Sequence, residues 1–514
     1  MSIVQANTVL LLCLTWVTVA VAQPSTAEQD LLRGHLEQAA GLVPHANQPG
    51  ADTALQSLQA DIAARRQAWS EALEHNVEAA ALLAGLAPHT LAQAQRLAPD
   101  TAVVQAVLKD GVTLPLLLAL TARRNAEAHN AYQHWRATVQ RFEQAAYLEE
   151  LVGQYRSFVR ELETQVGPQS HKEMPAKTFP FPAVLALKGQ AIDLEAEIAR
   201  LGYQQTLRTV LNQAARAFFD LQFATQARTI ITANRDLVAQ MEAITRAQLQ
   251  VGAATQVDVL KVQALLARLD NKQLSYERQR RNAAAQANAL LAVPPHTLWG
   301  VESAVALHDQ PGRIEDALQQ VRTQSQEVRK AAREIELMQT MVRMAETMLY
   351  PRASIGSSQL APSVGAEAGP TRTAMAAFPS MPVVGPEAAG FGANAAYIDE
   401  LRIRVPQAQA LLDEAMARTA FLAQDAHYRA DVSRREMQTL AQAVLPRAQH
   451  ALAATREQYA AGRGPFRDFF EASQTHLEAE LMHAEAHRDL HKALADLQDA
   501  TGTTVAPLLV RLTK

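Results

Sequence analysis

Two similar stretches of 14 residues occur in this chain, at a separation of 210 residues. The first copy, TRAQLQVGAATQVD, runs from Thr245 to Asp258, and the second, TREQYAAGRGPFRD, runs from Thr455 to Asp468. A gapless overlay matches Thr245, Arg246, Gln248, Gly252 and Asp258 with Thr455, Arg456, Gln458, Gly462 and Asp468. Similarity at a fixed offset indicates an internal duplication. We therefore expect two similar units, each a helical hairpin that turns at the repeated stretch.

The residues of the first turn explain how one helix ends there and another begins. Gly252 can adopt the left-handed conformation that ends a helix, because it has no Cβ. Thr255 is suited to cap the next helix, with Asp258 in its first turn, where a carboxylate meets free N–H groups.

The second turn uses different residues for the same purpose. Gly462 and Gly464 supply the turn, and Pro465 suits the first helical position. Helix capping is therefore one interpretation of Asp468, as it is of Asp258.

The composition favours an all-α fold with long helices and at most a small β portion. Aromatic residues make up only 5% of the 514 residues, and alanine, leucine, glutamine, arginine and glutamate dominate. The formal net charge of −4 is small, which gives no basic footprint for nucleic acid. The chain also has no phosphate-binding glycine loop, H-E-x-x-H or G-x-S-x-G motif. We therefore predict no enzymatic activity, no cofactor and no nucleic-acid partner.

The N-terminus is typical of a secretory signal peptide. The uncharged apolar run from Thr8 to Ala22 ends in Ala20-Val21-Ala22, a cleavage pattern that places residues 1–22 in the signal peptide. The single cysteine, Cys13, lies inside this run, so the mature chain would have neither a disulfide nor a thiolate metal site. No later segment reaches 18 apolar residues, and we expect no transmembrane helix. An exported protein of the periplasm or outer membrane is indicated.

Proline and glycine divide the rest of the chain. Residues 23–110 are predicted to form an N-terminal extension of several short helices. The first repeat covers residues 111–300, with its tip at 252–258, and includes one helix over 114–166 and a very long helix from about 184 to 251. The second repeat covers residues 301–502, with its tip at 462–468, and includes a helix over 313–349, a Pro/Gly-rich insertion at 351–392, and a descending helix from about Pro406, kinked at Pro446. Residues 503–514 form a tail.

A heptad seam is predicted on the return helix of the first repeat. Its residues are spaced 3-4-3-4-3, which suits side-by-side packing of helices. They are Val259, Val262, Leu266, Leu269, Gln273 and Tyr276.

The two tips resemble a known family. The segment Val444–Leu481, with a proline-bearing helix, a Tyr-x-x-Gly turn and an acidic residue before a Gln-bearing return helix, resembles the periplasmic tip of the outer membrane efflux proteins, the TolC-like family. The segment Leu249–Leu269 resembles the corresponding tip of the first half. Tyr350-Pro351-Arg352 resembles the junction of helix and membrane strands in that family. The resemblance covers roughly residues 110–502.

This resemblance implies a function and partners. Members are homotrimers whose helices form a tunnel across the periplasm, with four strands per protomer in an outer-membrane pore. A periplasmic adaptor docks on the tips and an inner-membrane pump supplies the substrate. The implied tip, gate and docking residues are Gly252, Asp258, Tyr459, Gly462, Arg463, Asp468 and Glu471. Gly464 stands where the family often has an arginine, for which Arg463 or Arg467 can substitute.

The strand-forming segments depart from the family. The break at 167–182 is too short for two transmembrane strands and a turn. The insertion at 351–392 is long enough, but its only aromatic residues are Phe378 and, at its end, Phe391, and prolines are scattered through it. Only Arg352–Gly356 reads as a strand. We therefore expect an atypical member with reduced barrel segments.

Histidines on the second return helix are weak candidates for a metal site. His483, His487 and His491 are four residues apart and share a helix face. In the repeat, however, His476 and His483 correspond to Leu266 and Gln273 of the seam, and no carboxylate or cysteine completes the spacing. Filling of seam positions is therefore the favoured interpretation, and no metal site is predicted.

Two functions remain open. The first is the outer-membrane component of a tripartite efflux system, a trimeric duct that exports small molecules. The second is a structural or interaction protein of the soluble periplasm that kept the hairpins and lost the pore. Intact tips in both halves favour the first, and the poor strand segments favour the second.

Overall fold

A computed structural model of the chain describes residues 51–142, 177–179, 182–252, 254–300, 312–348, 353–355 and 391–503. The predicted signal peptide, the tail beyond Thr503 and most of the insertion at 351–392 lie outside the described residues. Two units are distinguished. One comprises Met1–Ile62, Ala146–Lys188 and Glu346–Ala388, and the other Ala63–Ala145, Gly189–Ala345 and Ala389–Lys514.

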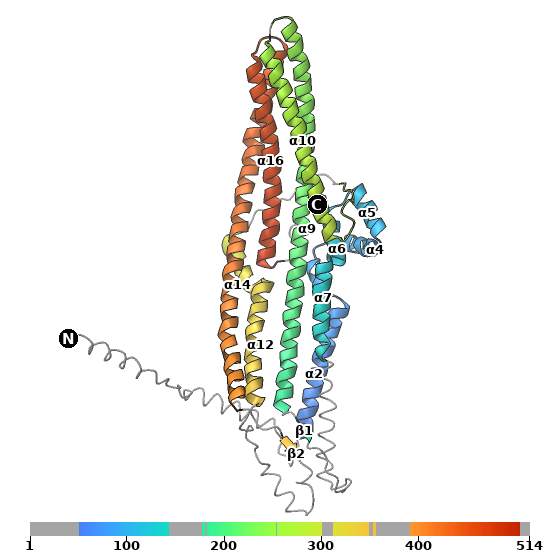
Figure 1. The fold of residues 1–514 in the computed structure, drawn as a ribbon, viewed down its shortest axis with the longest axis vertical. Helices are drawn as coiled ribbons and strands as arrows, with labels where there is room; N and C mark the ends of the chain where they lie inside the picture. The colour runs from blue at the N-terminus through green and yellow to red at the C-terminus, as the bar shows by residue number, and fades with distance from the viewer. Residues whose placement is uncertain are drawn as a thin grey trace, which may run out of the picture. The chain divides into compact units, whose positions relative to one another are not determined.

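The larger unit contains the two predicted hairpins. The first hairpin consists of α9 (Pro182–Gln250) and α10 (Gln256–Leu290). The second consists of α14 (Phe391–Thr439), a π-helical segment (Leu440–Val444), α15 (Leu445–Ala460) and α16 (Phe466–Thr501). These helices lie side by side (Figure 1). The prediction of an all-α fold with two long repeated hairpins is confirmed.

An apolar core runs between the hairpins. It is built from α9, α10, α15 and α16, with side chains that are at least nine-tenths buried: Phe223, Ala227, Ile231, Val238, Met241, Val262, Leu265, Leu269, Leu452, Tyr459, Phe466, Phe469, Leu477, Leu481 and Ala484. Leu266 and Tyr276 pack against it and are partly buried. The heptad seam therefore faces this core. Most of the stability of such helices comes from burial of an apolar face rather than from helix propensity.

The duplication extends to a pair of helices before each hairpin. Helices α6 (Leu114–Arg124) and α7 (Ala126–Val139) precede the first hairpin, and α11 (Ile314–Gln324) and α12 (Gln326–Met348) precede the second. The single helices predicted over 114–166 and 313–349 are therefore wrong, since each is interrupted. Asn125 interrupts the first because its side chain caps α7 by accepting a hydrogen bond from the Ala128 N–H at 2.9 Å. Ser325 stands at the equivalent junction.

Each return helix ends against one of these two junctions between helices, which we call corners. The carbonyls of Leu290 and Leu291 at the end of α10 accept hydrogen bonds from Asn125 and Arg124. At the end of α16, Gly502 lies so close to the corner that an added Cβ would be 2.5 Å from the Gln324 carbonyl oxygen.

The residues that end the two return helices occupy corresponding positions of the two repeats, and we call such residues mates. Ala292 has φ +52° and Gly502 has φ +76°, and they are 210 positions apart. Each follows its tip glycine, Gly252 or Gly462, by 40 residues. The segments from the tip glycine to this left-handed residue, which we call the arms, therefore have equal length.

The described part of the N-terminal extension consists of helices. They are α2 (Ala51–Glu74), α3 (Val77–Leu82), α4 (Pro88–Leu97) and α5 (Thr101–Asp110). Polar contacts attach them to α9, where Trp69 donates to Asp193 at 2.8 Å and Glu78 pairs with Arg200. The backbone N–H of Gly300, beyond α10, donates to the Leu108 carbonyl at 2.8 Å. The extension is therefore held both to the first part of α9 and to the segment that follows α10.

Prolines fall inside the descending helix of the second repeat. This helix begins at Phe391 rather than near the predicted Pro406, which lies within α14. Burial of Ile398 and Leu401 against Ala345 offsets the cost of a proline in a helix. The irregularity predicted at Pro446 takes the form of a π-helical segment that ends at Val444, two residues before the proline.

The smaller unit contains two short strands. The predicted strand at Arg352–Gly356 is confirmed as β2 (Ala353–Ile355). It pairs antiparallel with β1 (Lys177–Phe179), with Thr178 opposite Ser354. Each insertion thus supplies one strand. Among the described helices, none is both long and apolar enough to cross a membrane.

The corner contact of Gly502 yields a prediction with a matched control. Gly502→Ala should lower the free energy of unfolding by about 3 kcal/mol, because it combines a left-handed alanine with a clash. Gly462→Ala should cost only about 1–2 kcal/mol, since its φ is similar but nothing lies within 4 Å of an added Cβ. Urea unfolding of both variants measures the difference. Equal losses would contradict close packing at the corner.

Candidate functional site

The tip of the first hairpin is a fully capped turn. Gly252 has φ +75°. The Thr255 N–H donates to the Asp258 carboxylate at 2.9 Å, and the Asp258 N–H donates to the Thr255 hydroxyl at 3.3 Å. This is a capping box, and the capping role predicted for Asp258 is confirmed.

The tip of the second hairpin is built differently. Gly462 has φ +69°, and the N–H groups of Arg463 and Gly464 both donate to the Gln458 carbonyl, at 2.9 and 3.1 Å. Pro465 occupies the N-cap rather than the predicted first helical position, and its side chain makes no capping hydrogen bond. Asp468 lies in the first turn of α16, so its carboxylate acts there through charge rather than through a capping box.

Tyr459 joins the two hairpins. Its side chain is 3% exposed, and its hydroxyl donates to the Thr245 hydroxyl at 2.9 Å. Gln248 donates from its side chain to the Tyr459 carbonyl at 2.7 Å. Burial raises the pKa of the Tyr459 phenol, so this group stays protonated and remains a donor. Thr245 and Gln248 were not predicted as site residues, although both lie among the matched positions of the repeat.

Aromatic rings surround Tyr459 on the side of α16. Its ring centroid lies 5.9 Å from that of Phe466 and 5.6 Å from that of Phe469. Contacts of this geometry add stability beyond area burial. The turn of the second hairpin is therefore anchored from inside.

The other predicted tip residues lie at the surface. Gly252, Gly462, Arg463, Asp468 and Glu471 are exposed, and Asp258 is half-buried. Glu471 accepts from Arg467 at 2.7 Å. Beside them are three exposed apolar side chains of the first hairpin, Val251, Val257 and Leu260. The tips thus combine an anchored interior with a surface of charges and apolar groups. Gate and docking roles for these residues stay predictions.

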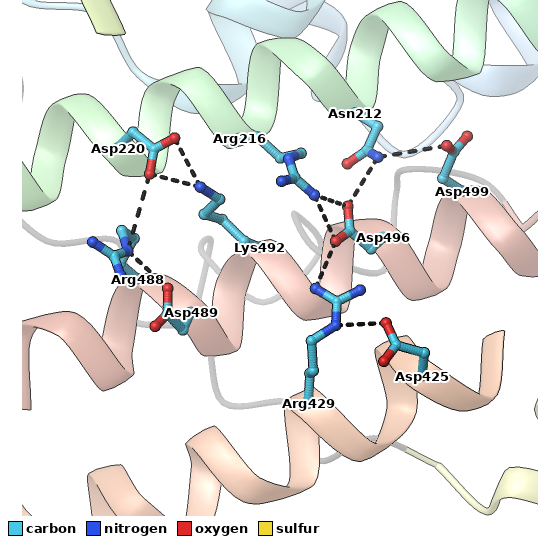
Figure 2. Close-up of polar contacts among 10 residues, drawn as sticks. All are labelled: Asn212, Arg216, Asp220, Asp425, Arg429, Arg488, Asp489, Lys492, Asp496 and Asp499. Atoms are coloured by element: carbon cyan, nitrogen blue, oxygen red, sulfur yellow. Dashed lines mark hydrogen bonds and ion pairs between the residues drawn. The ribbon is translucent and has the colours of Figure 1, made fainter. Parts of the chain in front are cut away.

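A cluster of charged residues joins α9, α14 and α16 (Figure 2). Asp496 of α16 is its centre and accepts hydrogen bonds from Arg216 at 2.6 Å, Arg429 at 3.0 Å and Asn212 at 3.2 Å. Asp220 of α9 pairs with Lys492 at 2.8 Å. Because several donors converge on Asp496, whose side chain is 13% exposed, the cluster fixes the register between α9 and α16.

Arg208 and Asp499 lie at the end of this cluster. The Arg208 guanidinium is buried and donates to the carbonyls of Gln498, Gly502 and Thr503, which closes the end of α16. Asp499 receives only a 3.5 Å contact from Asn212. Burial is the main reason that the pKa of Asp499 rises to about 6 and that of Arg208 falls to about 10.

The candidate metal-binding histidines occupy packing positions. The His491 ring is 1% exposed and stacks on Phe219 at 4.9 Å, and the His487 ring lies 4.2 Å from it. Burial lowers the pKa of His491 to about 3 and lowers those of His483 and His487. Within the described ranges, no group of three histidine, cysteine, aspartate or glutamate side chains is arranged to hold a metal ion.

Comparisons with solved structures identify the fold as that of outer-membrane channels. The outer-membrane channel OprN superposes with a TM-score of 0.57 at 16% identity, over 78% of this chain and 92% of that one. VceC of Vibrio cholerae superposes with a TM-score of 0.56 at 13% identity, over 79% and 99%. The open MtrE channel of Neisseria gonorrhoeae gives 0.56 at 13%, over 76% and 89%. No family model and no curated protein sequence matches this chain.

These likenesses define the protein first as an all-α chain of two repeated hairpins with the architecture of an outer-membrane channel protomer. More particularly, the chain has the TolC-like fold, and the resemblance inferred from its two tips is confirmed at the level of the fold.

The hydrogen bond between Tyr459 and Thr245 can be measured by a double-mutant cycle. Tyr459→Phe and Thr245→Val should each lower the free energy of unfolding by about 1 kcal/mol. The double variant should lose little more than either single variant, because both remove the same bond. Urea unfolding gives the three values, and strict additivity would show that the two hydroxyls are not coupled.

Asp499 predicts a pH dependence of stability. Its pKa of about 6 in the folded chain is above the ordinary value of 3.8, so the folded chain binds this proton more tightly than the unfolded chain. Its contribution therefore becomes less favourable as the pH rises from about 4 to 6 and stays unfavourable above that range. Asp499→Asn should be more stable than the native chain by about 1–2 kcal/mol at neutral pH, a value reduced for solvent screening.

This advantage of Asp499→Asn should vanish near pH 4, where the native carboxyl is protonated. Urea unfolding of both chains across this pH range measures it. A variant that is less stable than the native chain at neutral pH would instead assign a stabilising ion pair to Asp499 and Arg208.

Proposed function

We propose that this chain is the outer-membrane component of a tripartite efflux system and forms a trimeric helical duct for the export of small molecules. The observation that carries this proposal is the extent of the fold likeness. The chain superposes on nearly the whole of outer-membrane channel protomers, up to 99% of VceC. The matched proteins are channels rather than enzymes, which agrees with the lack of a catalytic motif.

The tips support a docking role. Both hairpins end in ordered turns, and their surface carries charged side chains beside exposed Val251, Val257 and Leu260. Apolar groups within a polar rim are typical of surfaces that bind a protein partner. We assign this surface to a periplasmic adaptor, which would connect the duct to an inner-membrane pump. Gly252, Gly462, Arg463, Asp468 and Glu471 would lie in or beside that contact.

Fractionation of cells that express the native chain tests the location. The proposal expects the processed chain to stay with the outer membrane through an alkaline wash and to be released only by detergent. The released particle should have three times the mass of one chain. Recovery in the periplasmic extract would overturn the proposal, and the chain would then act as a periplasmic interaction protein.

Introducing negative charge at the tip tests the docking surface. Val257→Glu combined with Leu260→Glu should leave the unfolding midpoint of the chain nearly unchanged, because both side chains are more than half exposed. It should abolish copurification with the adaptor, since a buried unpaired charge opposes binding. Leu298→Glu, which is 62% exposed and lies beyond the end of α10 that is opposite the tip, is the matched control for adaptor binding. Equal loss from both changes would contradict docking at the tip.

A further inference from the structure

The descending helix of the second repeat exposes an apolar stripe that the first repeat buries. The π-helical turn at Leu440–Val444 holds one residue more than an α-helical turn. The offset between α9 and the second descending helix is therefore 210 at the tip and 209 below Leu440. At that offset, Phe421, Tyr428 and Val432 of α14 are the mates of Asn212, Phe219 and Phe223 of α9.

These mates differ sharply in exposure. Phe421, Tyr428 and Val432 are 66%, 59% and 61% exposed. In the first repeat, Phe219 and Phe223 are 1% and 6% exposed. The stripe is spaced 7 and 4 residues along α14, which places its members on one face.

Helix α16 of the same chain covers the face in the first repeat. Asn212 contacts Asp496, Phe219 stacks on His491, and the Arg488 guanidinium lies 4.4 Å from the Phe223 ring centre. Nothing in the described part of the chain does the same for the stripe on α14.

The return helices show the complementary difference. Leu274 of α10 is 70% exposed, whereas its mate Ala484 of α16 is 2% exposed. The Arg281 side chain is 76% exposed, whereas its mate His491 is 1% exposed. The face of α16 that covers α9 therefore has an uncovered counterpart on α10.

We propose that the α14 stripe of one copy packs against α10 of a second copy, in the register of the internal contact between α9 and α16. This inference rests on the proposed assembly and specifies its contact surface. Carried over by the repeat, the three internal contacts place Phe421 on Gln286, Tyr428 on Arg281 and Val432 on Arg278 of the second copy.

The side chains suit this contact. Arg278 and Arg281 are exposed, and the stems of long basic side chains cover apolar surface while their charges stay in water. A guanidinium over the Tyr428 ring is a favourable cation–π pair. The internal contact depends on the charges around Asp496, whereas the contact between copies replaces the Asn212–Asp496 pair with Phe421 and Gln286.

The geometry of this contact determines the type of assembly. The surface on α14 differs from the surface on α10, so the contact is head-to-tail. Such contacts give a closed ring when the rotation closes. The same register also applies at the tip. Gln240 accepts a hydrogen bond from Arg456 at 3.0 Å within the chain. The corresponding contact between copies pairs His450 of one copy with Arg246 of the other.

Cysteine crosslinking tests the register in a Cys13→Ser background. Two pairs should join copies through a short bismaleimide: Tyr428→Cys with Arg281→Cys, and His450→Cys with Arg246→Cys. The swapped pairs, Tyr428→Cys with Arg246→Cys and His450→Cys with Arg281→Cys, use the same four positions but would lie about 33 Å apart. Gln240→Cys with Arg456→Cys should react within one chain and shows that the reagent works.

The outcomes separate the register from the assembly. Ladders of joined chains from both predicted pairs and neither swapped pair support the proposal. A particle of several chains by sedimentation, without ladders from the predicted pairs or with ladders from the swapped pairs, overturns the register and leaves assembly standing. A single chain at all concentrations overturns both. Joining of the Tyr428→Cys position to a different protein would overturn the second copy as the occupant.

A charge in the stripe provides a second measurement. Tyr428→Glu should weaken association between copies at least tenfold in sedimentation while the far-ultraviolet spectrum and unfolding midpoint of the single chain stay unchanged. Tyr397→Glu is the control, because Tyr397 is 46% exposed on α14 but lies about 45 Å from Tyr428. Equal association of the native chain and Tyr428→Glu would overturn the proposal.

Discussion

A helix of 69 residues has no core of its own, so α9 depends on continuous contact with its neighbours. The duplication provides that contact. Each descending helix is followed by a return helix, and α16 then lies against α9 as well as α14. The apolar core supplies the burial, and the cluster around Asp496 adds directional contacts that stop one helix from sliding along the other. The corners, caps and tips serve to terminate this arrangement.

The two tips reach similar turns by different physical means. In the first, the Thr255 and Asp258 side chains satisfy the exposed N–H groups of α10. In the second, Pro465 cannot do so, and the turn depends on Tyr459, which is held by aromatic rings and by Thr245 and Gln248. The first tip is therefore stable through local contacts, whereas the second depends on the first hairpin. Both constructions leave polar and apolar groups at the surface of the tips.

Local rules predicted the hairpins well because the relevant signals are local. Gly252, Thr255 and Asp258 define a turn within seven residues, and the seam from Val259 to Tyr276 lies on one helix. The break at Asn125 was not predicted, because the Asn125 side chain also bonds to the end of α10, 165 residues away. The start of α14 was missed for a related reason, since burial of Ile398 and Leu401 outweighs the local effect of Pro406.

The candidate site was predicted only in part. The surface residues of the tips follow from the repeated turn, but the position of Tyr459 inside the protein depends on contacts with α9. The cluster around Asp496 was not predicted, because its members are polar and charged residues from three helices. Asn212 and Asp496, for example, are 284 positions apart. His491 shows the converse. Its spacing suggested a ligand, whereas its environment is the Phe219 ring.

The equal arms of the two hairpins set a limit on change in this protein. Each arm spans 40 residues between the tip glycine and the left-handed residue at its foot. Removing one residue from one arm would shorten it by about 1.5 Å and turn every later side chain by about 100° around the helix axis. The altered arm could no longer meet both its corner and its neighbour. Natural variants should therefore differ by substitution within the arms and confine insertions and deletions to the segments between the repeats.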